Sequence, residues 1–124
     1  MSLYAAALDP RIDATLVCGY FERRDALWRE PIYRNVWGLL TEFGDAEIAG
    51  MISPRRLVIE ACQTPRVKGP PKPRPGRAGG APGRIEAIQL DSVLPEFEKA
   101  KVFYHKLRKP NELVLVVSGT GQGP

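Results

Sequence analysis

The chain has 124 residues, of which 44% are hydrophobic and 26% charged, with two cysteines and a formal net charge of +4. This length suits one domain with one core, and the composition excludes a fully disordered, collagen-like or membrane protein. The longest apolar run, Leu113 to Val117, is too short to cross a bilayer. The run from Ala5 to Leu8 is too short for the apolar part of a secretory signal, so we expect a cytoplasmic protein.

The positive charge belongs to one segment, residues 65–84, which is called the basic segment below. It contains six basic residues and no acidic one, and it leaves 12 Lys and Arg against 14 Asp and Glu elsewhere. Its six prolines and five glycines predict an extended, solvated loop or insertion. Because no aromatic side chain in it can stack on a base, the nucleic-acid signal is weak.

Helix-like and strand-like patterns alternate along the chain. Apolar runs with β-branched residues indicate strands, and apolar residues at helical spacing indicate helices. In chain order the predicted elements are a helix over 2–8, a strand over 12–19, a helix over 32–43, a helix over 45–52 capped by Asp45, a strand over 57–61, a helix from Asp91 or Ser92 to about Lys109, and a strand over 113–118.

This order predicts an α/β fold with a partial three-stranded parallel sheet and flanking helices. Continuously apolar strands indicate a sheet covered on both faces through right-handed crossovers. We expect residues 1–64 to form a βα segment, residues 65–84 a loop or insertion, and residues 85–124 the final helix and strand of the same domain. Three such strands leave long apolar edges, which predicts a piece of a larger sheet or self-association.

The candidate metal and cofactor ligands are few. Cys18 and Cys62 lie in apolar, strand-like runs and are predicted to be buried. His105 is the only histidine, and its place in an amphipathic helix predicts a solvated position, so no zinc cluster is expected. The glycines of residues 119–123 lack the spacing of a dinucleotide-binding loop. We therefore expect neither a metal nor a cofactor.

Three stretches, AALDPRIDATLVCGYF, DAEIAGMISPRRLVIEA and LVLVVSGTGQGP, carry a family resemblance. They resemble the C-terminal half of the α/β-hydrolases, most closely bacterial relatives of acetyl-xylan esterases and dienelactone hydrolases. The resemblance implies the last three strands of an eight-stranded sheet, and an activity on carboxylic ester or peptide bonds.

The family's catalytic residues follow the chain order Ser, Asp or Glu, His, with the serine on a G-x-S-x-G elbow. None of the four serines here has glycine two residues away on both sides, so the resemblance implies an elbow before Met1. Glu60 stands about where the family has its acid, and Gln122 stands where its histidine is expected. Glutamine cannot accept and return a proton as imidazole does. The chain alone is therefore predicted to be inactive.

Several features keep alternatives open. The favoured alternative for Glu60 is a strand-end carboxylate that points to solvent or pairs with Arg55, Arg56 or Arg66. The aromatic residues Trp28, Tyr33 and Trp37 fit either a hydrolase lid or core packing.

Two kinds of partner are expected, namely the missing N-terminal half of a hydrolase or a second copy of the chain. The alternative function is a non-catalytic binding module that acts through the basic segment.

Overall fold

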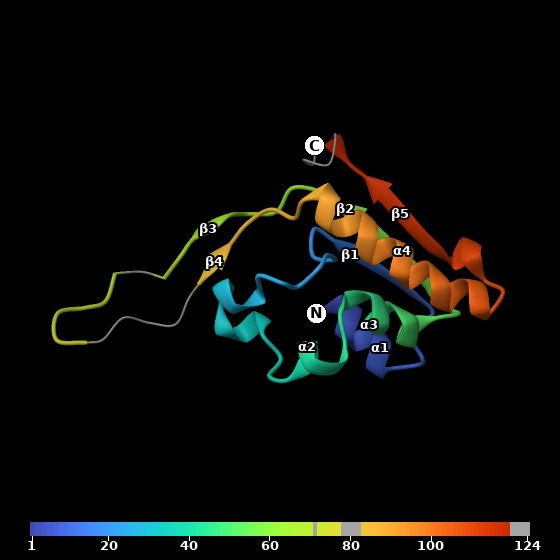
Figure 1. The fold of residues 1–124 in the computed structure, drawn as a ribbon, viewed down its shortest axis with the longest axis horizontal. Helices are drawn as coiled ribbons and strands as arrows, with labels where there is room; N and C mark the ends of the chain where they lie inside the picture. Colours follow the sequence, from blue (N-terminus) through green and yellow to red (C-terminus); the bar gives the residue numbers. More distant parts are fainter. Residues whose placement is uncertain (71, 78–82, 120–124) are drawn as a thin grey trace.

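The computed structural model describes residues 1–70, 72–77 and 83–119. Its centre is a parallel sheet of three strands, β1 (Ala14–Cys18), β2 (Arg56–Ala61) and β5 (Leu113–Val117), in the order β1-β2-β5 (Figure 1). The predicted α/β class, with a three-stranded parallel sheet and flanking helices, is confirmed. The three strands lie within one or two residues of their predicted bounds.

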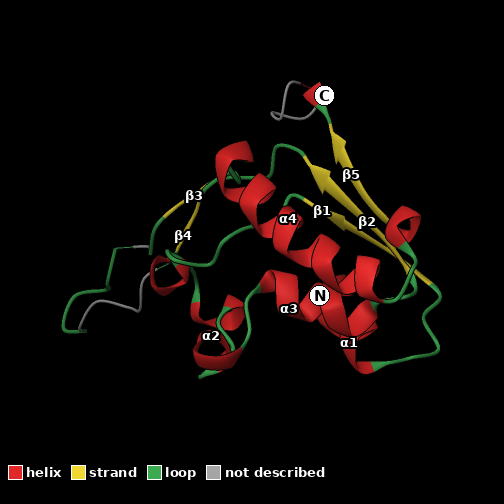
Figure 2. Ribbon diagram, turned by 45° about the vertical axis from the view of Figure 1, so that its right-hand side comes forward, coloured by secondary structure: helices red, strands yellow, loops and turns green. Residues whose placement is uncertain are grey.

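Three helices pack together on one face of this sheet (Figure 2). Helix α1 (Ser2–Leu8) contacts β1 and α3 (Asp45–Ile52), and α3 contacts α4 (Leu90–Lys106). The predicted helices over 2–8 and 45–52 are confirmed, and α4 begins one residue earlier and ends three residues earlier than expected. Among residues 1–70, 72–77 and 83–119, no helix has the length and apolar character that crossing a bilayer requires.

The alternation of side chains along the strands separates a covered face from an open one. Val17, Leu57 and Ile59 are buried beneath the helices. On the opposite face Leu16 is 54% exposed and Val116 41% exposed. The prediction of a sheet covered on both faces is therefore wrong. Right-handed crossovers that step in one direction across a sheet place their helices on the same face.

The segment between β1 and α3 is less regular than its sequence suggests. It contains the short 3-10 helices η1 (Leu27–Arg29) and η2 (Ile32–Arg34) and one helical turn, α2 (Leu39–Glu42). The predicted helix over 32–43 is wrong, because Gly38 adopts a left-handed conformation with φ of 75°. Trp37 is 96% exposed, and Trp28 and Tyr33 are also exposed, so core packing does not explain these aromatic residues.

The basic segment is not entirely a loop. Its ends pair as two short antiparallel strands, β3 (Val67–Lys68) and β4 (Arg84–Ile85), with Lys68 opposite Arg84. Figures 1 and 2 show this pair extending away from the sheet and its helices. The basic side chains of the segment, namely Arg66, Lys68, Lys72, Arg74, Arg77 and Arg84, are all exposed.

Arg55, which precedes β2, ties the amino end of the sheet together. Its guanidinium donates to the carbonyl oxygens of Ala6 at 2.7 Å, Ile12 at 2.7 Å and Asp9 at 3.0 Å. These carbonyls lie at the end of α1 and in the turn to β1, where a helix leaves acceptors unsatisfied. The hydroxyl of Tyr104 in turn donates to the carbonyl of Arg55 at 3.2 Å, which adds α4 to the same junction. A further 3-10 helix, η3 (Pro110–Glu112), leads into β5.

A buried ion pair fixes the segment after β1 to the start of α3. The Asp45 carboxylate accepts hydrogen bonds from Arg24 Nε at 3.0 Å and from the Glu22 backbone N–H at 3.1 Å. The Arg24 guanidinium also lies 3.7 Å from the centroid of the Tyr20 ring. Asp45 was predicted as the helix cap, but Gly44 occupies that position. Asp45 instead neutralises a buried cation beside the positive end of the helix dipole.

We expect Asp45→Asn to lower the free energy of unfolding by about 3 kcal/mol, because it removes the closest counter-charge of the buried Arg24 guanidinium and leaves the more distant Glu30 at 3.5 Å and Glu22 at 4.0 Å. Urea denaturation followed by circular dichroism measures this change. The matched control is Asp25→Asn, which breaks the exposed 2.6 Å pair with Arg23 and should lower the stability by less than about 1 kcal/mol. Equal losses in the two variants would contradict a structural role for the buried pair.

Candidate functional site

Polar side chains gather where the three parallel strands end. Cys18, the last residue of β1, lies opposite Glu60 near the end of β2. Ser118 follows β5 directly, and its backbone N–H donates to the carbonyl of Ala61 at 3.1 Å. Because Ile59 and Ala61 point into the helical layer, Glu60 points to the open face. The carboxyl ends of parallel strands are where α/β folds place their sites.

A neighbouring hydroxyl holds the Glu60 carboxylate. The hydroxyl of Ser118 donates a hydrogen bond to Glu60 Oε1, and Cys18 lies opposite Glu60 in the register of the strands. The hydrogen bond from Ser118, followed by the influence of the Cys18 thiol, lowers the pKa of Glu60 below its ordinary value. Glu60 is thus an ionised acceptor with a fixed orientation at neutral pH.

The two thiols are not activated as nucleophiles. Partial desolvation by the surrounding atoms, followed by the neighbouring Glu60 carboxylate, raises the pKa of Cys18 to about 11. Burial and the charge of Glu60 also raise the pKa of Cys62. A thiol that stays protonated at neutral pH is a poor nucleophile and a poor metal ligand. Cys18 is therefore a neutral neighbour of Glu60 and not an activated nucleophile.

Gly19 allows the chain to turn tightly at this edge. Its φ is 57°, and its backbone N–H donates to the carbonyl of Glu60 at 2.9 Å. A Cβ atom there would lie 2.1 Å from Thr64 Cγ2 and 3.3 Å from the carbonyl oxygen of Cys62. Both the positive φ and the close approach favour glycine, and they bring the chain after β1 against the chain after β2.

The structure separates the residues that the sequence analysis grouped together. Among the described residues, Glu60 makes no ion pair, so the alternative of an Arg partner is wrong. Arg55 donates to backbone carbonyls and Arg56 pairs with Glu112 at 3.6 Å. His105 is exposed, as predicted, but it follows Tyr104, which bonds to the opposite, amino end of the sheet. Gln122 lies outside the described residues.

Both cysteines were predicted to be buried. This prediction is wrong for Cys18, which is exposed on the open face, and Cys62 is partly buried. The sequence analysis also did not identify Cys18 and Ser118 as partners of Glu60. Their positions at the ends of the two strands that flank β2 were the available signal. In the part of the chain that the structure describes, no group of three or more His, Cys, Asp or Glu side chains is arranged to bind a metal ion.

Comparison of the chain with protein-family models, curated proteins and solved structures found no match. The assignment of a function therefore depends on the geometry of the site itself. That geometry provides an oriented carboxylate without an adjacent imidazole among the described residues. Such a group can accept a hydrogen bond and position its donor, but it does not complete a proton-transfer system by itself.

We expect Ser118→Ala to raise the pKa of Glu60, because the hydroxyl that donates to its carboxylate is removed. Carboxyl-carbon NMR titration of the Glu60 side chain measures the shift directly. Since the folded pKa lies below the unfolded one, Glu60 contributes stability at high pH that is lost as the pH falls through its folded pKa. Ser53→Ala, a serine at the other end of the sheet, is the control and should leave the titration unchanged. An unaltered Glu60 titration in Ser118→Ala would show that this bond is absent in solution.

Proposed function

We propose that this chain forms the acid-bearing part of an α/β-hydrolase-type fold that acts on carboxylic ester or peptide bonds. The observation that carries the proposal is the position of Glu60, at the carboxyl end of the middle strand and facing the open side of the sheet. In a Ser-His-acid site the acid accepts the imidazole N–H and orients the ring. A carboxylate has about four lone-pair sites, so the Ser118 donor leaves capacity for an imidazole.

The arrangement of the sheet supports the same proposal. Glu60 precedes the last described strand in the chain, in agreement with the order of acid before histidine in these enzymes. The apolar side chains of Leu16 and Val116 on the open face are suited to packing against a second helical layer. We propose that this layer, with further strands beside β1, comes from a nucleophile-bearing half or from a second copy of the chain.

The described residues contain no G-x-S-x-G elbow, so we expect the chain alone to show no saturable hydrolysis of p-nitrophenyl acetate. Loss of a triad member typically lowers the rate by several powers of ten. Glu60→Gln is the matched control, and its rate should equal that of the unaltered chain. Saturable turnover that disappears in Glu60→Gln would contradict the expected inactivity.

A positive test of the proposal is the coding sequence upstream of the Met1 codon. An in-frame G-x-S-x-G ahead of Ser2 would support it, and in that longer protein Glu60→Gln should reduce kcat by about 10²–10⁴-fold. A longer protein whose activity is unchanged by Glu60→Gln would refute the assigned role of Glu60.

A second candidate function is binding through the basic segment, and one observation favours it. All its described basic side chains are exposed, and among the described residues only Arg84 forms an ion pair, with Glu86 at 3.4 Å. An exposed cationic segment binds phosphates non-specifically. We nevertheless propose that the segment is a surface insertion, because it has no aromatic side chains and the rest of the chain is net acidic.

Deletion of residues 70–82 tests this choice. A Cβ on Gly83 would lie 3.5 Å from Pro70 N and 3.7 Å from the Gly69 carbonyl carbon, so the two ends of the deletion are adjacent. The shortened chain reads Lys68-Gly69-Gly83-Arg84, a two-residue hairpin loop between paired strands. We expect the fold to be retained and the stability to rise by about 2 kcal/mol or less, because each halving of the loop length recovers only about 0.6 kcal/mol of closure entropy. A tight, salt-sensitive RNA complex of the full chain that is lost on deletion would establish the binding function instead.

A further inference from the structure

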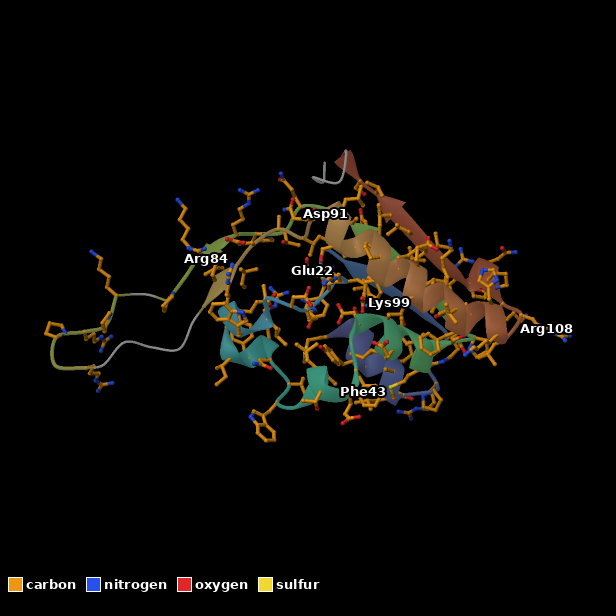
Figure 3. All side chains as sticks on the ribbon, in the orientation of Figure 1. Glu22, Phe43, Arg84, Asp91, Lys99 and Arg108 are labelled. Carbon is orange, nitrogen blue, oxygen red and sulfur yellow. The ribbon has the colours of Figure 1, made fainter. Side chains whose placement is uncertain are left out.

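A large apolar pocket lies on the helical side of the sheet. It encloses about 780 Å³ between α1, α3 and the segment around α2. Figure 3 labels Phe43 at the edge of this region. Its walls include Tyr4 and Leu8 of α1, Ile48 and Met51 of α3, and Val36 and Phe43 of the intervening segment. Glu60 points to the other side of the sheet, so this pocket is separate from the candidate site described above.

The walls leave apolar surface in contact with water. Four of the apolar lining residues are exposed to solvent, namely Leu8, Val36, Phe43 and Met51. They come from three different segments of the chain and line the same pocket. A contiguous apolar surface of this kind on a small domain marks a ligand or partner site. A concave apolar pocket with a few polar groups is the usual form of a small-molecule site.

The polar groups of the pocket are concentrated around Tyr20. The hydroxyls of Tyr4 and Tyr20 lie 3.1 Å apart, and Arg34 stacks 5.0 Å from the centroid of the Tyr20 ring. Burial and the contact with Tyr20 raise the pKa of Tyr4, which keeps its hydroxyl neutral. Arg34 is the only charged side chain among the lining residues. These groups offer hydrogen-bond donors and, at Arg34, a positively charged guanidinium.

Arg34 keeps capacity for an anion. Its Nε pairs with Glu30 Oε2 at 2.9 Å, but among the described residues its two terminal nitrogens donate no hydrogen bond within the protein. A guanidinium with unused donors beside an apolar cavity is complementary to a carboxylate attached to a hydrocarbon. The same guanidinium repels an ammonium group placed at that position.

We propose that this pocket binds a small amphiphilic monocarboxylate, such as a medium-chain fatty acid, with its hydrocarbon between α1 and α3 and its carboxylate at Arg34. This inference goes beyond the hydrolase proposal and does not depend on it. Burial of the hydrocarbon provides the affinity, and the Arg34 guanidinium selects the head group.

Titration calorimetry of the full chain with decanoate and decylammonium, below micelle concentrations, tests the proposal. We expect one saturable decanoate site, binding at least roughly tenfold tighter than decylammonium. Shortening decanoate to octanoate removes two methylenes and should weaken binding by roughly tenfold. Equal affinity for decanoate and decylammonium would overturn the assignment of Arg34.

A pair of matched variants locates the site. Val36 is 49% exposed and lines the pocket, whereas Val102 on α4 is 50% exposed and lies outside it. Val36→Glu should weaken decanoate binding at least roughly tenfold, because it places a carboxylate against the bound anion. Val102→Glu should leave the affinity unchanged, and circular dichroism checks that both variants are folded. Equal affinity in the two variants would show that decanoate binds elsewhere and would refute the proposal.

Discussion

The structure depends on the constraint that β1, β2 and β5 follow one another in a single direction across the sheet. With right-handed crossovers, this order places the helices between them on one face. Leu57 and Ile59 are buried on that face, while Leu16, Val116 and Glu60 point away from it. A sheet with helices on one side only has one covered apolar face and one that is available to a further layer.

The two faces therefore have different chemistry. On the open face the Ser118 hydroxyl orients Glu60 and lowers the pKa of its carboxyl group, which favours the ionised form that accepts hydrogen bonds. On the helical face the buried Arg24 and Asp45 pair anchors the segment after β1. The anchored segment forms one wall of the apolar pocket. The hydrolase proposal and the monocarboxylate proposal thus concern opposite sides of one sheet and are tested separately.

Much of the fold was predictable because local patterns determine it. The apolar runs around Ile59 and Leu115 indicate strands, and the pattern around Ile48 indicates a helix. The open face was not predictable, because the sequence pattern around an apolar residue such as Leu16 does not depend on whether a second layer covers that residue. The prediction of a helix over 32–43 was wrong because Gly38 adopts a left-handed conformation that interrupts the helix, although the apolar residues have helical spacing. Glu60 was singled out from its place at the end of a predicted strand. The hydroxyl that bonds to it comes from another strand end, and the register that brings the two together is not revealed by any local pattern.

The central claim is that only one face of the sheet is covered, and hydroxyl-radical footprinting tests it most directly. Leu16 and Leu57 are chemically identical side chains on adjacent strands, 54% and 0% exposed. At the lowest protein concentration, where light scattering reports a monomer, Leu16 should be oxidised and Leu57 protected. Protection of Leu16 should rise with concentration if copies of the chain associate through the open face. Equal protection of Leu16 and Leu57 in the monomer would contradict the account.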